Sequence, residues 1–102
     1  MEMIKTTNEN VALNWAQGSP AMSSNGNYRT DGMNLYSYFT LIGFTTNNGQ
    51  KVLGDFTSAG GRFLSRTTSS KHIPAARDVA MAIFSPEDFD QVADLENITV
   101  RK

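Results

Sequence analysis

Apolar and β-branched residues gather between positions 35 and 56, and this stretch predicts the centre of the fold. Residues 35–45 read LYSYFTLIGFT, a run of aromatic and β-branched side chains typical of a strand that is covered on both faces. Asn47-Asn48-Gly49 follows, and an Asn-Gly pair supplies the positive φ angles of a tight hairpin turn. We therefore expect a second strand over 50–56. A third strand over 62–67 would complete an antiparallel meander.

The pattern after the meander predicts two helices. Four apolar residues recur at i, i+3, i+7 and i+11 and form one stripe, with Pro74 suited to the first helical turn: Ile73, Ala76, Ala80 and Phe84. The sequence Ser85-Pro86-Glu87-Asp88 is typical of a second helix start, because it combines a capping hydroxyl, an N1 proline and acids in the first turn. This second helix is expected to run to about Asp94.

Two parts of the segment before the meander, residues 8–16 and residues 18–34, each allow two structural interpretations. Residues 8–16 favour a short helix ended by Gly18, although Val11, Leu13 and Trp15 also alternate as they would in a strand. Residues 18–34 are polar and turn-rich. They form either one long surface loop or a short strand at 27–30 between two Gly-containing turns.

Together these elements predict an α+β fold in which residues 1–102 form a single domain. We expect an antiparallel sheet of three to five strands, with one or two C-terminal helices packed on one face. No apolar run approaches the ~20 residues that cross a bilayer, and the N-terminus has no apolar signal region, so we expect a cytoplasmic protein with no membrane partner.

Charge is distributed unevenly along the 102 residues, although the net charge is only −1. Residues 29–77 hold six cations and two anions, whereas residues 78–96 hold six anions and no cation. The near-zero sum argues against a general nucleic-acid binder. The asymmetry suits either two solvated faces that attract each other or a basic sheet face and an acidic helix face that dock a partner.

Several short motifs occur in a fixed order between residues 11 and 73: Trp15-Ala16, Leu35-Tyr36-Ser37-Tyr38, Ile42-Gly43, Gly54-Asp55, and Phe63-x-Ser65-x-Thr67-Thr68-Ser69-Ser70-Lys71-His72. This order resembles a family of small, mostly uncharacterised proteins of bacteriophages and related mobile elements. Here an extra serine precedes Lys71, and Gly43 stands where the family more often has alanine. The resemblance implies a phage accessory protein in the bacterial host cytoplasm. By association it suggests an inhibitor of a host defence system, such as an anti-CRISPR protein.

His72 is the only histidine and the strongest candidate for chemistry. As a general base it would need Ser69 or Ser37 beside it and Asp55 to orient it. We favour the alternative, a junction histidine that packs on Tyr36 or Tyr38. With one histidine and no cysteine, only a carboxylate-rich metal site would be possible, and no spacing supports one, so we expect no metal site. We also expect no cofactor and no enzymatic activity.

The predicted function is binding to a host protein or protein complex. The alternative is a nucleotide or nucleic-acid binding module that uses the junction from Thr67 to His72 and a basic sheet edge, where hydroxyls, a cation and helix N–H groups would meet an anion. A homodimer is compatible with either function. The candidate binding residues are Tyr36, Tyr38, Arg62, Arg66, Thr68, Ser69, Lys71 and His72.

Overall fold

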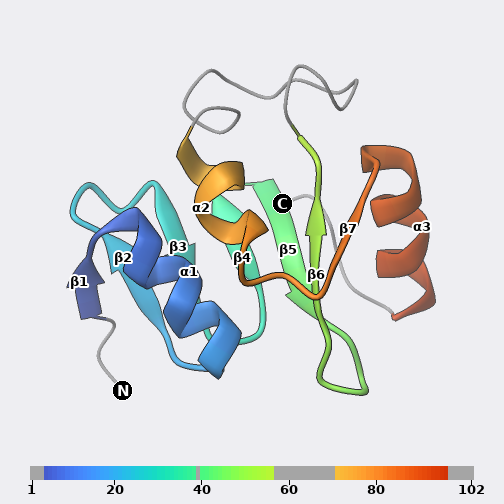
Figure 1. Ribbon diagram of the computed structural model, residues 1–102, viewed down its shortest axis with the longest axis horizontal. Helices are drawn as coiled ribbons and strands as arrows, with labels where there is room; N and C mark the ends of the chain where they lie inside the picture. Colours follow the sequence, from blue (N-terminus) through green and yellow to red (C-terminus); the bar gives the residue numbers. More distant parts are fainter. Residues whose placement is uncertain (1–3, 39, 57–70, 97–102) are drawn as a thin grey trace.

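The computed structural model describes residues 4–38, 40–56 and 71–96, which form a seven-stranded mixed sheet and three helices (Figure 1). In chain order the elements are β1 (Ile4–Thr6), α1 (Asn8–Gln17), β2 (Ala21–Ser23), β3 (Tyr28–Thr30), β4 (Leu35–Ser37), β5 (Thr40–Thr45), β6 (Lys51–Gly54), α2 (Ile73–Arg77), β7 (Ala82–Phe84) and α3 (Pro86–Leu95).

The strands lie side by side in the order of the chain, from β1 at one edge to β7 at the other. The four pairings between β2 and β6 are antiparallel, whereas β1 pairs with β2 and β6 with β7 in parallel. Parallel neighbours need a crossover connection. In the chain α1 lies between β1 and β2, and α2 lies between β6 and β7.

The fold class predicted from sequence is wrong in two respects. The sheet has seven strands of mixed direction, not three to five antiparallel strands, and the helices lie on both faces instead of one. Five of the strands have only three residues, which is too short for an alternating pattern to stand out. Parallel pairing leaves no hairpin signal, because the partners are joined through a helix.

The predicted central strand over 35–45 is in fact two strands. Chain reversal occurs after β4, where Tyr38 adopts φ 56°, and Ser37 then pairs with Thr40 of β5. A tyrosine in the left-handed region is unusual, so the residue types gave no sign of this turn. The turn predicted at 47–49 does join β5 to β6, with Gly49 at φ 84°. The expected strand at 62–67 lies outside the described residues.

Three helices were expected, and two of them form close to the predicted bounds. In α1 the side chain of Thr7 accepts from Asn10 N–H, and Gly18 ends the helix in the left-handed conformation. In α3 the side chain of Ser85 accepts from Asp88 N–H, which confirms the predicted start. The third prediction fails, because α2 stops at Arg77, and Phe84, the last residue of the predicted stripe, lies in strand β7.

The core has two layers that the central strands separate. A Cβ atom placed on Gly43 would lie 2.9 Å from the ring of Trp15, so this position of β5 faces α1. The next residue, Phe44, packs against Phe89 of α3 with ring centroids 5.1 Å apart. Successive residues of a strand point to opposite faces. The face that α1 and α2 cover is called the helix face below, and the opposite face, which α3 covers over β5–β7, is called the outer face.

Candidate functional site

His72 lies on the helix face, immediately before α2, and it contacts the predicted partner Ser37. The Ser37 Oγ and His72 Nδ1 atoms are 2.6 Å apart, and both residues are buried, at 1% and 2% exposure. Local backbone explains the position: β4 directs alternate side chains to the helix face, and α2, with Pro74 in its first turn, begins directly after His72.

Aromatic rings enclose the His72 imidazole. Tyr28 of β3 stacks on it with centroids 4.4 Å apart and planes 12° from parallel, and Tyr38 lies 5.9 Å away at a tilt. Burial lowers the pKa of His72 to about 4, so the ring is neutral at pH 7. Burial, with a smaller contribution from Glu9, raises the pKa of the Tyr28 hydroxyl, which therefore also stays neutral.

A neutral histidine bonded to a serine hydroxyl has the residue types of a nucleophilic dyad. Two features of the site oppose that chemistry. Asp55, the residue expected to orient the ring, instead forms an ion pair with Arg77 at 3.7 Å. The Ser37 hydroxyl is also enclosed in the core, so a substrate has no route to it in this conformation. The pair joins β4 to α2 and satisfies two buried polar groups.

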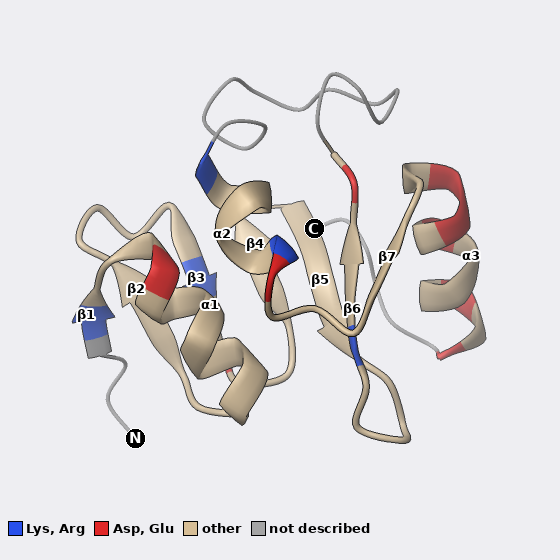
Figure 2. Cartoon of the chain, viewed as in Figure 1, with Lys and Arg blue, Asp and Glu red and all other residues tan. Residues whose placement is uncertain are grey.

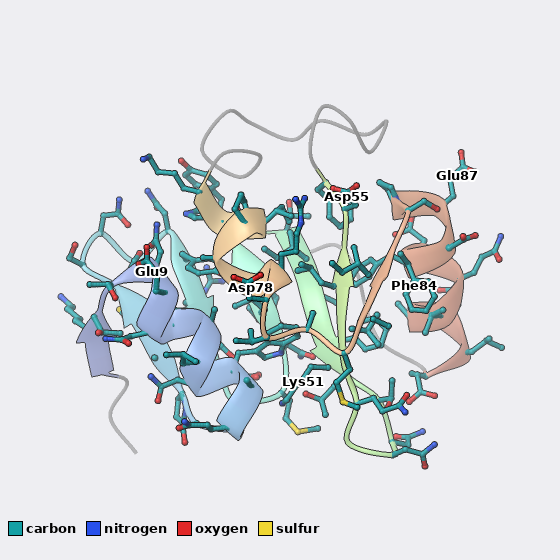
Figure 3. The ribbon with its side chains drawn as sticks, viewed as in Figure 1. Glu9, Lys51, Asp55, Asp78, Phe84 and Glu87 are labelled. Atoms are coloured by element: carbon teal, nitrogen blue, oxygen red, sulfur yellow. The ribbon has the colours of Figure 1, made fainter. Side chains whose placement is uncertain are left out.

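Lys71 precedes His72 in the chain but lies in a different environment. It is exposed and lines a hollow of about 350 Å³ between the start of α1 and the length of α2, together with Asn8, Glu9, Pro74, Ala75 and Asp78. Figure 3 shows Glu9 on α1, and Asp78 follows the last residue of α2. Two carboxylates beside one ammonium group do not favour an anion. Lys71 and His72, which were predicted to bind one anion together, therefore lie apart, with Lys71 at this hollow and His72 in the core.

The remaining candidate residues divide between the two faces and the part of the chain that the structure does not describe. Tyr36 lies on the outer face, where the guanidinium carbon of Arg29 sits 4.9 Å from its ring centroid. Tyr38 is 37% exposed and accepts a hydrogen bond from Arg29 through its carbonyl oxygen at 2.5 Å. Arg62, Arg66, Thr68 and Ser69 fall outside the described residues. The structure thus brings Tyr38 and His72 together and places Tyr36 and Lys71 elsewhere.

Sequence reasoning missed a buried cation, Lys51. Its ammonium group donates to Gly32 O at 3.0 Å and to Thr45 Oγ1 at 2.6 Å, and it lies 5.8 Å from the Trp15 ring centroid. Burial lowers the pKa of Lys51, and Asp31 partly offsets the effect. Lys51 follows the Asn-Gly turn by two residues, but nothing in the local pattern indicates burial. Its contacts fix the turn after β3, so its role is structural.

The described residues contain neither a metal site nor a membrane-spanning helix. Among them, no group of three or more histidine, cysteine or acidic side chains is arranged to hold a metal ion. None of the described helices is long and apolar enough to cross a membrane. Comparison with protein-family models, with curated proteins and with solved structures finds no match to this chain.

Proposed function

We propose that this chain is a non-enzymatic protein that acts by protein–protein contact, with strand β7 as its recognition edge. The observation that carries the proposal is the position of β7: it pairs with β6 on one side, and the described residues place no strand on its other side. An edge strand offers unpaired backbone N–H and C=O groups to which an extended segment of a partner can bind.

Apolar side chains accompany this edge. Met81 is 67% exposed and Ile83 is 42% exposed. Ile83 is the middle residue of β7, and Met81 directly precedes the strand. Proteins commonly protect edges with charge, proline or a bulge. Residues 81–84 read MAIF and contain no charge and no proline. A partner strand would therefore gain main-chain hydrogen bonds and apolar contacts together.

The buried dyad supports the non-enzymatic part of the proposal. Ser37 and His72 have suitable residue types and a short contact, yet both are enclosed by the sheet and α2. A catalytic hydroxyl has to reach its substrate. We therefore assign this pair a structural role in the core.

The proposed partner is a host protein, in the context of a phage accessory protein in the bacterial cytoplasm. This part of the proposal rests on the resemblance of residues 11–73 to the phage family, which suggests a component of a host defence system. The alternative, nucleotide or nucleic-acid binding at the Thr67–His72 junction, receives less support from the described part. There His72 is buried, and Lys71 shares its hollow with Glu9 and Asp78.

Affinity capture of the tagged chain from a nuclease-treated bacterial lysate tests the proposal. We expect one host protein at a stoichiometric level, retained after nuclease treatment and identified by mass spectrometry. An empty capture, or one that nuclease abolishes, would contradict protein–protein contact and favour the alternative. Thermal-shift titration with nucleotides would then be the appropriate measurement.

A further inference from the structure

In the described part of the chain, no helix packs on the outer side of strands β1–β4. α3 packs over β5–β7 through Phe89, whereas the outer side of β1–β4 carries a row of directly paired residues. Lys5 pairs with Met22, Met22 with Arg29, and Arg29 with Tyr36. Directly paired residues share a face. We call these four residues the basic row.

The basic row combines charge with flat apolar surface. Lys5 is exposed, and Met22, Arg29 and Tyr36 are half-buried. The Arg29 guanidinium lies over the Tyr36 ring at 4.9 Å, and the Asn34 amide lies 3.4 Å from the Tyr36 hydroxyl. These contacts hold the arginine and the tyrosine in place before any partner binds, which lowers the entropy cost of association.

Helix α3 carries the opposite charge. The segment 86–96 contains five acidic residues and no lysine or arginine, and Figure 2 shows them along the helix at one end of the molecule. Phe89 and Ala93 point into the core, so the helix turns its other side outward. Figure 3 shows Glu87 pointing away from the sheet. We call the exposed residues Glu87, Asp88, Asp94 and Leu95 the acidic helix face.

We propose that two copies of this chain associate through their outer faces, with α3 of each copy seated on the basic row of the other. Both surfaces belong to the same side of the sheet and cover adjacent halves of it, so one two-fold axis can form both contacts at once. Acids of one copy then meet Lys5 and Arg29 of the other. Leu95, which is 80% exposed, meets the apolar parts of Met22 and Tyr36.

Dimensions agree with this arrangement. Ten helical residues in α3 span about 15 Å, and four neighbouring strands place Lys5 about 14 Å from Tyr36. The interface uses residues other than Met81 and Ile83, so it is independent of the proposed recognition edge.

A second copy fits the basic row better than a nucleic acid does. The chain itself supplies the complementary charge, and the net charge is −1. A polyanion on the basic row would also lie beside the acids of α3 on the same side of the sheet, and like charges there would repel it.

A charge-swap experiment tests the proposal. One variant carries Lys5→Glu and Arg29→Glu, and the other carries Glu87→Lys and Asp94→Lys. Sedimentation equilibrium of the wild type should give a dimer whose dissociation constant rises with salt concentration. Each variant alone should dissociate at least about tenfold more readily, because like charges then face each other. An equimolar mixture should regain the dimer, because in the mixed pair both contacts join opposite charges again.

Circular dichroism melting of each variant separates lost association from lost folding, and recovery in the mixture is possible only if both variants fold. A monomeric wild type, or a dimer that neither reversal weakens, would overturn the proposal. So would variants that fold but fail to associate when mixed. Saturable binding of a single-stranded oligonucleotide to a monomeric wild type, lost on Arg29→Glu, would also overturn it and assign the basic row to nucleic acid.

Discussion

The Oγ atom of Ser37 lies 2.6 Å from Nδ1 of His72 across 35 residues of chain. One residue belongs to β4 and the other immediately precedes α2, so this contact fastens the second crossover helix to the middle of the sheet. Tyr28 stacks on the other side of the imidazole and extends the connection to β3. The cluster therefore links elements from distant parts of the sequence.

Removing either partner should destabilise the fold. His72→Ala loses a buried hydrogen bond and a stacked ring and leaves a cavity, so we expect a loss of about 3 kcal/mol in the free energy of unfolding. Ser37→Ala should cost about 1–2 kcal/mol, because it leaves a ring nitrogen without its partner. Urea unfolding of the single and double variants measures the coupling between the residues, which we expect at about 1 kcal/mol. Strictly additive losses would show that the contact contributes nothing.

Stability should fall as the pH drops from 6.5 towards 4. Burial lowers the pKa of His72 from 6.5 to about 4, so between these values the unfolded chain binds more protons than the folded chain does. The contribution of the neutral His72 to the free energy of unfolding is fully present above pH 6.5. It decreases as the pH falls, and the total loss below pH 4 is about 3 kcal/mol.

The His72→Gln variant is the control for this pH dependence, because glutamine is polar and does not titrate. Subtracting its unfolding free energy from that of the wild type, pH by pH, removes the shared contribution of the carboxylates. A difference that does not change between pH 4 and 6.5 would contradict a buried neutral imidazole.

Gly43 should not tolerate substitution by alanine. A Cβ atom there would lie 2.9 Å from the Trp15 ring and 3.1 Å from Val52 O, so neighbours must shift to admit it. We expect Gly43→Ala to cost about 1–3 kcal/mol. In a Trp15→Phe background, where the smaller ring leaves space, the same substitution should cost less. An equal cost in both backgrounds would show that the tryptophan does not set the requirement for glycine.

Lys51 should stabilise the turn after β3 through its two hydrogen bonds. Lys51→Met keeps a long apolar side chain but leaves Gly32 O and Thr45 Oγ1 without this donor, so we expect a loss of about 1–2 kcal/mol. Lys51→Ala removes the packing over Trp15 as well and should cost about 3 kcal/mol. Urea unfolding, with amide exchange at Met33 and Asn34, checks both losses. A stable Lys51→Ala variant with unchanged exchange would refute the structural role.

Local signals in the sequence predicted those parts of the fold that depend on local chemistry. The cap at Ser85, the helix end at Gly18 and the turn at 47–49 each follow from residues that satisfy or shape nearby backbone. Parallel pairing at both edges and the reversal at Tyr38 depend on tertiary packing, which the pattern does not encode.

The sequence predicted part of the candidate site, namely the contact of His72 with a serine, but not its burial. Ser37 was one of two serines considered as the neighbour of His72, and the structure places it in contact with the ring, whereas Ser69 lies outside the described residues. The burial of the pair was not apparent, because it results from Tyr28, a residue of a three-residue strand that the sequence offered only as an alternative to a loop. Lys51 was assigned to a strand, but the turn that covers it lies 19 residues earlier.

Quantitative capture with matched variants tests the proposed recognition edge most directly. The chain carrying Met81→Lys and Ile83→Lys is compared with the wild type and with Leu13→Lys, which changes a comparably exposed leucine on α1. All three are first shown to melt alike and are then used to capture from nuclease-treated lysate. The account predicts that the partner protein is retained by the wild type and Leu13→Lys and is lost on the β7 variant. Equal retention by all three chains would contradict recognition through β7.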